Sequence, residues 1–313
     1  MKELLHETLS YRRIAADARA GRQPHAVLIL FPDAAHLRAL LKECAKAFFS
    51  AEEGSRTALL IEKESYSDCL FFPQEGAKLT VDDAARILEE SLLRPVEGEK
   101  KLFVLDAFHT AGALVQNKLL KVLEEPPEGV SFLLGAAQEH AVLPTVLSRT
   151  EKFREPPFAE ESILKALLRM YPAEQGLERA AAASGGILSQ AERLLAGGGE
   201  SFRLAEEFLL SDAPEAFCRR AEKLEKDAFF AALELLLRDM LLLRTGQERF
   251  SSRTDERARA LAERYPTGVI LSALEGVRKA QRRVNFNAGL GQTLYALALS
   301  MKEEEKRWQK LSS

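Results

Sequence analysis

Short apolar runs alternate with amphipathic stretches through the first half of the chain. The apolar runs favour strands at residues 25–30, 58–61, 69–72, 102–105 and 132–134. The amphipathic stretches, such as residues 37–49 and 81–93, repeat apolar side chains at helical spacing. Continuous apolar strands separated by helices are typical of a parallel sheet that is covered on both faces. We therefore predict an α/β fold for residues 1–155.

The strand pattern ends at Pro156 and Pro157, and helical patterns follow. Short helical patterns lie at residues 160–170, 174–184 and 189–195, and the glycines at 197–199 then break the pattern. We expect a small helical domain at residues 156–199.

From residue 201 to about residue 306 the pattern is helical throughout. Residues 228–243 are apolar on most faces, so neighbouring helices must bury them, either in the same domain or from another chain. The basic cluster at residues 278–283 contains no interleaved aromatic residue, which favours an exposed or interface face of a helix over a DNA contact. We predict an all-α domain at residues 200–313.

Composition limits the class of protein. Of the 313 residues, 46% are hydrophobic and 29% are charged, as in ordinary soluble proteins. The net charge of −3 gives no overall basic field, so any DNA contact must be local or must belong to a partner. No apolar run approaches the about 18 residues of a membrane span, and the first residues lack the apolar core of a signal peptide. We expect a cytoplasmic protein without a membrane partner.

The chain contains three cysteines, Cys44, Cys69 and Cys218. They are too few and too scattered for a disulfide framework or for a zinc site with about four closely spaced ligands. We predict that all three are buried thiols and that the chain binds no metal.

Two phrases stand out, NKLLKVLEEPP at residues 117–127 and VLPTVLSRT at residues 142–150. Both resemble the bacterial clamp-loader family of AAA+ proteins, in which the second phrase is close to LLPTILSRC. The distance between the phrases also matches without a gap, and the resemblance extends from about residue 23 to residue 150. The prolines of the first phrase end the helix at residues 117–123, and residues 124–127 need no further function.

Residues 31–38 lie between a predicted strand and a predicted helix, where a phosphate-binding loop is expected from the resemblance. In such a loop glycines let backbone N–H groups approach phosphate, lysine reaches the outer phosphates, and serine or threonine holds Mg²⁺. The sequence FPDAAHLR contains none of these residues, and Phe31 and Leu37 put apolar side chains where phosphate would lie. We expect no nucleotide binding and no cofactor.

Other positions also lack the residues of an active ATPase. Ala107 follows Asp106 where an ATPase has glutamate after aspartate, so we predict that Asp106 is a cap or turn residue. Ala136 and Ala137 cannot donate side-chain hydrogen bonds to a γ-phosphate. Leu188 stands near the place of a sensing arginine. All these positions indicate loss of the same activity.

Ser148 and Arg149 are the exception. The resemblance implies that Arg149 is an arginine finger, supplied in trans to the γ-phosphate bound by a neighbouring subunit, with Ser148 in support. Arginine offers a fixed charge and a bidentate fork that stabilise the transition state. The alternative is that Arg149 only pairs with a local carboxylate, such as Glu151 or Glu155.

A broken phosphate-binding loop beside an intact Ser-Arg pair resembles the delta-prime subunits of DNA polymerase III. The resemblance implies a non-catalytic clamp-loader subunit that helps to load the sliding clamp onto primed DNA. Its three domains would be an AAA+-like α/β domain, a helical lid and a helical collar for oligomerisation. Its partners would be the ATPase subunits (gamma/tau) and the delta subunit, with the sliding clamp and primed DNA reached through the complex.

Two other functions stay open. One is an ATP-hydrolysing clamp-loader subunit of the gamma/tau kind, which needs a Gly-Lys-Ser or Gly-Lys-Thr triplet that the sequence lacks. The other is a scaffold of another AAA+ assembly, because a subunit without a nucleotide site could serve in a clamp loader or in such an assembly. Co-purification with clamp-loader ATPase subunits would separate these functions.

Overall fold

The computed structural model divides into two compact units. The first comprises Met1–Ala166 with Ile187–Ser189, and the second comprises Leu167–Gly186 with Gln190–Ser313. The residues described are 1–22, 24–174, 176–196, 199–211, 213–221, 224, 226–252, 254, 256–286 and 288–312. Gly197 and Gly198, part of the expected second domain boundary, lie outside them, and the division into three domains stays a prediction.

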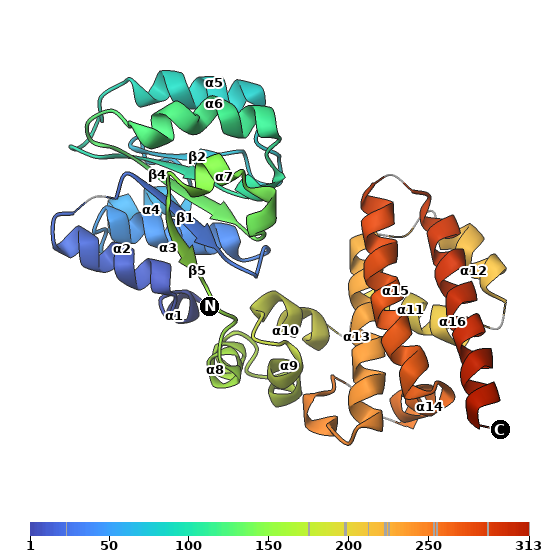
Figure 1. Cartoon of the computed structure of the whole chain (residues 1–313). Helices are drawn as coiled ribbons and strands as arrows, with labels where there is room; N and C mark the ends of the chain where they lie inside the picture. The colour runs from blue at the N-terminus through green and yellow to red at the C-terminus, as the bar shows by residue number, and fades with distance from the viewer. Residues whose placement is uncertain are drawn as a thin grey trace. The chain divides into compact units, whose positions relative to one another are not determined.

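A parallel five-stranded sheet forms the centre of the first unit (Figure 1). Its spatial order is β2-β3-β4-β1-β5, and every neighbouring pair is parallel. The strands are β1 (Ala26–Leu30), β2 (Cys69–Phe72), β3 (Lys101–Leu105), β4 (Val130–Ala136) and β5 (Glu151–Arg154). Because the strands are parallel, the loops that follow β1, β3 and β4 emerge side by side at one edge of the sheet.

Helices cover both faces of this sheet, as predicted. They are α1 (Lys2–Leu5), α2 (Leu9–Arg19), α3 (Leu37–Phe48), α4 (Arg56–Glu62), α5 (Val81–Ser91), α6 (Ala113–Glu124) and α7 (Pro144–Leu147). Short 3₁₀ turns, η1 (Phe108–Thr110) and η2 (Glu139–Ala141), follow β3 and β4. Leu28 belongs to a core with Ile87 of α5 and Leu119 of α6. The next residue, Ile29, belongs to a second core with Leu40 of α3. Successive strand side chains point to opposite faces, so β1 joins both cores. The predicted α/β class with a parallel sheet is confirmed.

The strand predicted at residues 58–61 is wrong, because these residues belong to helix α4. The side chain of Ser55 accepts a hydrogen bond from the Ala58 N–H at 3.2 Å and caps the helix. Ala58 and Ile61 are buried while Leu59 is 53% exposed, which is a helical face. A run of four apolar residues is compatible with a strand or a helix, and here the cap at Ser55 favours the helix.

Strand β5 was not predicted, because its sequence EKFR is mostly polar and exposed. It pairs with β1 at the sheet edge, with Leu28 beside Lys152. The other predicted strands are confirmed, and the helices predicted at residues 37–49, 81–93 and 117–123 correspond to α3, α5 and α6.

The helical pattern after Pro157 is also confirmed. The helices are α8 (Glu160–Met170), α9 (Leu177–Ala183), α10 (Leu188–Leu195), α11 (Gly199–Leu210), α12 (Pro214–Arg220), α13 (Lys226–Arg244), α14 (Glu256–Arg264), α15 (Thr267–Asn285) and α16 (Leu290–Ser312), with the 3₁₀ turn η4 (Glu248–Phe250). Side chains of α13 such as Phe229 and Leu233 are buried in a core with Val277 of α15 and Leu294 of α16. The side chains of this core between Phe229 and Met240 are therefore covered within their own unit.

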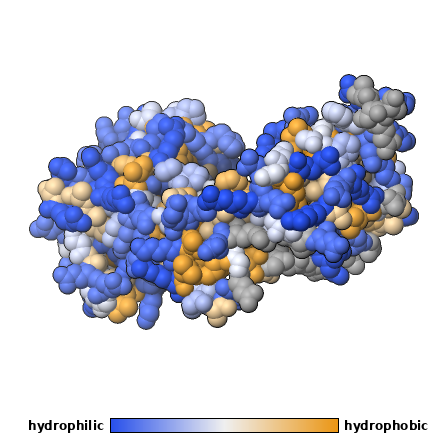
Figure 2. Space-filling model, turned by 90° about the horizontal axis from the view of Figure 1, so that it is seen from below, coloured by the Kyte–Doolittle hydropathy of each residue, from blue (hydrophilic) through white to orange (hydrophobic). Residues whose placement is uncertain are grey.

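Hydrophilic side chains cover most of the face drawn in Figure 2, with smaller hydrophobic groups between them. None of the described helices combines the length and the apolar character that a membrane span requires.

Candidate functional site

The loop after β1 is filled by its own apolar side chains. Phe31 is 1% exposed, and its ring meets the edge of Phe158 at a centroid distance of 5.9 Å. Leu37, also 1% exposed, packs against Gly135 of β4, where an added Cβ would lie 3.0 Å from Leu37 Cδ1 and 2.7 Å from Leu41 Cδ1. Apolar side chains therefore occupy the space that a phosphate group would need.

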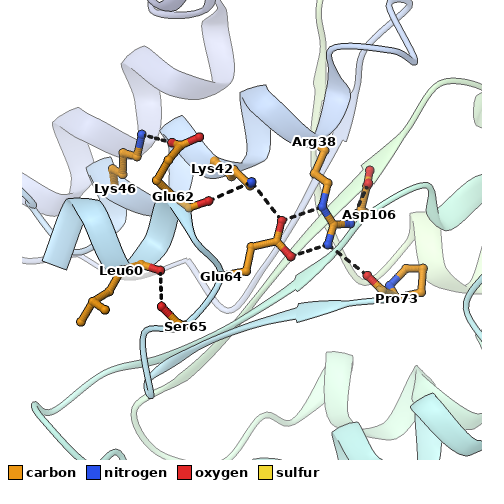
Figure 3. A network of polar contacts seen from close by, with 9 residues as sticks. All are labelled: Arg38, Lys42, Lys46, Leu60, Glu62, Glu64, Ser65, Pro73 and Asp106. Carbon is orange, nitrogen blue, oxygen red and sulfur yellow. Dashed lines mark hydrogen bonds and ion pairs between the residues drawn. The ribbon is translucent and has the colours of Figure 1, made fainter. Parts of the chain in front are cut away.

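Arg38, at the start of α3, forms the centre of a polar network at the same edge of the sheet (Figure 3). Its Nε and Nη2 donate to the two carboxylate oxygens of Glu64 at 2.7 and 2.6 Å. Its Nη1 donates to Asp106 Oδ2 at 3.0 Å, and Nη2 also donates to the carbonyl of Pro73 at 3.1 Å. Lys42 Nζ lies 3.0 Å from Glu64 Oε1. The acid that would order a metal ion in an ATPase is thus already bound to an internal cation.

The charges of this network stabilise one another. Burial alone would raise the pKa of Glu64, but hydrogen bonds from Arg38 and Lys42 hold that pKa below its ordinary value. Burial alone would lower the pKa of Arg38, and the hydrogen bonds to Glu64 and Asp106 raise it above its ordinary value. Arg38 is 8% exposed, so the pairing is largely shielded from solvent.

Asp106 is a turn residue, one of the two roles that the sequence predicts for it. Its Oδ1 accepts from the N–H of Ala107 at 2.7 Å, while Ala107 has a positive φ of 46° and starts the turn η1. His109 of that turn accepts from the N–H of Ala137 at 3.2 Å. Burial, with some help from His140, lowers the pKa of His109 despite the opposing effect of Asp106. The His109 ring thus joins η1 to the residue that follows β4.

Asp33 links this loop to the start of α10. It is 1% exposed, and its Oδ2 accepts from the N–H of Ser189 at 2.9 Å and lies 3.0 Å from His36 Nδ1. A carboxylate is stabilised near the N-terminus of a helix by the backbone N–H groups and the helix dipole. Burial would raise the pKa of Asp33, but the hydrogen bonds to His36 and Ser189 lower it. Leu188, beside Ser189, is 1% exposed, so this position holds buried apolar packing.

Arg149 lies outside this network, directly after the end of α7. Its Nε donates to Glu124 Oε2 at 2.7 Å, and its Nη1 donates to the carbonyl of Thr145 at 3.0 Å. Ser148 Oγ donates to the same carbonyl at 3.1 Å and lies 3.5 Å from Nη1. The side chain of Arg149 is 30% exposed. The two phrases that resemble clamp loaders therefore meet at an ion pair.

The local partner of Arg149 differs from the two candidates named from the sequence. Glu155 instead accepts from the backbone N–H groups of Leu9 and Ser10, at 2.8 and 2.7 Å, and caps α2. Glu151 lies 3.9 Å from Arg13. Sequence reasoning assigned no function beyond the helix end to residues 124–127, and so missed Glu124. The sequence pointed to Glu124 only through its place in the phrase at residues 117–127 that resembles clamp loaders.

The thiols of Cys44, Cys69 and Cys218 are all buried and free, as predicted. Burial raises the pKa of each of them. The described residues contain no group of three or more His, Cys, Asp or Glu side chains that could hold a metal ion.

Comparison with known proteins agrees with the two phrases. The family model described as "DNA polymerase III, delta subunit" matches residues 7–159. The DNA polymerase III subunit tau of Bacillus subtilis is 25% identical over 242 residues, which cover 66% of this chain and 43% of that protein. The tau subunit of Escherichia coli is 35% identical over 78 residues, covering 25% of this chain and 12% of that protein. Residues 7–159, about half of the chain, are therefore similar to the DNA polymerase III clamp-loader family.

Two solved structures are similar over most of the chain. A gamma subunit-related protein of DNA polymerase III from Thermotoga maritima has a TM-score of 0.47 and 21% identity, with 95% of this chain and 99% of that one covered. The clamp-loader delta protein of Bacillus subtilis has a TM-score of 0.37 and 12% identity, with 93% and 99% covered. The matches to the two tau subunits span less than half of those proteins' length.

Proposed function

We propose that this chain is a non-catalytic, delta-prime-like subunit of the DNA polymerase III clamp loader. It helps to load the sliding clamp onto primed DNA and contributes Arg149 to the ATP site of a neighbouring subunit. Its direct partners are the gamma/tau ATPase subunits and the delta subunit. The three-domain plan of α/β domain, lid and collar belongs to this proposal.

The contacts of Arg38 carry the proposal. Its guanidinium supplies, from within the chain, positive charge to Asp106, the acid that an ATPase would use for its metal ion. Together with buried Phe31 and Leu37, this arrangement supports a site that folds without nucleotide. A buried, unpaired phosphate charge would cost several kcal/mol.

Similarity to this family alone leaves a second candidate, an ATP-hydrolysing subunit of the gamma/tau kind, because the relatives named above are tau subunits. The residues of the loop oppose it, since residues 31–38 offer neither glycine nor lysine nor a hydroxyl group. Affinity purification from the native cell distinguishes a third possibility: recovery of a different AAA+ assembly without clamp-loader ATPases would contradict the replication role.

The finger is tested in the assembled clamp loader by Arg149→Ala. We expect ATP turnover and clamp loading to fall while complex assembly and thermal stability are retained. Arginine fingers contribute about 10³-fold or more in the best-studied cases, and one finger among several ATP sites would show a smaller loss. Arg149→Lys should restore turnover only in part, because lysine lacks the fork.

Arg56→Ala is the matched control. Arg56 is another exposed arginine of the first unit, paired with Glu97 at 2.6 Å. A complex carrying Arg56→Ala should hydrolyse ATP normally. Unchanged turnover and loading with Arg149→Ala would contradict the finger and leave the chain a scaffold.

A further inference from the structure

The ion pair between Glu124 and Arg149 joins two segments that are far apart in the sequence. Glu124 is the last residue of α6, and Arg149 follows Ser148, the C-cap of α7. The contact is specific to one of two adjacent acids: Arg149 Nε donates to Glu124 at 2.7 Å. The neighbouring Glu125 is exposed and takes no part in the bond.

The contacts of Arg149 leave one edge of its guanidinium open. The group carries N–H donors on Nε, Nη1 and Nη2. Glu124 takes Nε, and the carbonyl of Thr145 takes one donor of Nη1. Within the described part of the chain, Nη2 has no hydrogen-bond partner, and the side chain is partly exposed. The contacts with Glu124 and with the Thr145 carbonyl thus fix the plane of the guanidinium, while Nη2 can donate to an oxyanion.

The pair has little to do with holding the fold together. The side chains of Glu124 and Arg149 are 56% and 30% exposed, and ion pairs of this kind contribute little to stability. Their effect is instead to restrict the rotamers of a long side chain. Restricting a reacting group before it meets its substrate lowers the entropic cost of the transition state.

We propose that Glu124 is the positioning residue for Arg149. It accepts from Nε and holds the guanidinium so that Nη2 points to the γ-phosphate bound by the neighbouring subunit. This inference rests on the proposed function, because it assumes that Arg149 reaches that phosphate. The role needs a hydrogen-bond acceptor at position 124 rather than a negative charge.

The test is the steady-state ATPase of the complete clamp loader with variants of this chain. Glu124→Ala should lower kcat about fivefold and leave the KM for ATP unchanged, because the finger acts on the transition state. Glu124→Gln should keep at least about half of the wild-type kcat, since its amide oxygen still accepts from Nε. Glu125→Ala, the adjacent control, should behave as wild type.

A double variant separates positioning from a merely structural role. Glu124→Ala should have no further effect once Arg149 is replaced by alanine, because there is no guanidinium left to position. The thermal midpoint of the chain should move by no more than about 2 °C in Glu124→Ala. If Glu124→Ala does not enter the complex, Glu124→Asp replaces it: the shorter side chain withdraws the acceptor, so the same loss of kcat is expected.

The outcomes separate this inference from the proposed function. Wild-type kcat in Glu124→Ala, beside a reduced kcat in Arg149→Ala, would overturn the positioning role and leave the finger intact. A raised kcat in Glu124→Ala would also overturn it, since Glu124 would then restrain Arg149. Wild-type kcat in Arg149→Ala would overturn the finger itself.

Discussion

Arg38 and Arg149 lie in the same unit, and each contacts a carboxylate, yet their surroundings differ. Arg38 is 8% exposed and donates to Glu64, Asp106 and the Pro73 carbonyl. The Arg149 side chain is 30% exposed and pairs with Glu124, and its Nη2 has no hydrogen-bond partner among the described residues. The first guanidinium makes four hydrogen bonds within its own chain, whereas the second makes fewer and is more exposed. The first arrangement suits a structural cation, and the second suits a cation that meets a ligand.

The difference predicts effects of unequal size on stability. Arg38→Met should lower the free energy of unfolding by about 3 kcal/mol, because it leaves two partly buried carboxylates without their cation. Arg149→Met should change it by less than about 1 kcal/mol, as for other exposed pairs. Urea unfolding of the isolated chain measures both. Equal losses in the two variants would contradict the distinction between the two arginines.

The stability of the wild type should also depend on pH more steeply than that of Arg38→Met. This effect should be smaller than the loss of stability in Arg38→Met itself. The pKa of Glu64 is lowered in the folded state, so its contribution is present above the ordinary pKa of about 4.5 and is lost as pH falls through the folded value. Replacing Arg38 by methionine removes a hydrogen bond that lowers this pKa.

Urea unfolding between about pH 6 and about pH 3.5 should therefore show a steeper loss in the wild type than in Arg38→Met. Glu64→Gln should flatten the curve similarly, while Asp33 continues to titrate in both variants. Parallel curves for the wild type and Arg38→Met would show that Arg38 does not control this titration.

The smallest expected effect concerns nucleotide. A fluorescent ATP analogue with Mg²⁺ should show no saturable binding at micromolar concentration to the wild type. Arg38→Ala should not create binding either, because residues 31–38 still lack phosphate donors on lysine or a hydroxyl group and still contain Phe31 and Leu37. Binding by the variant alone would assign the exclusion of nucleotide to Arg38, and binding by the wild type would contradict the proposed loss of the site.

The element types were largely predictable because they depend on local periodicity. The runs at β1 and β3 and the spacing in α3 and α5 predicted these elements from neighbouring residues alone. The pattern was short in α4, where the cap at Ser55 favours a helix. It was polar in β5, where pairing with β1 makes the segment a strand. Local sequence carries no information about a partner strand that lies far along the chain.

The sequence by itself determined which chemistry is missing from the loop after β1, and it placed Arg149 in a recognisable phrase. Only the tertiary structure decided what each arginine touches. Arg38 meets residues 26 and 68 positions away, and Arg149 meets one 25 positions before it. Such contacts exist because parallel strands bring their carboxyl ends to one edge and because α6 and α7 end close together. The packing around an arginine therefore decides whether its guanidinium is a buried structural cation or a partly exposed hydrogen-bond donor.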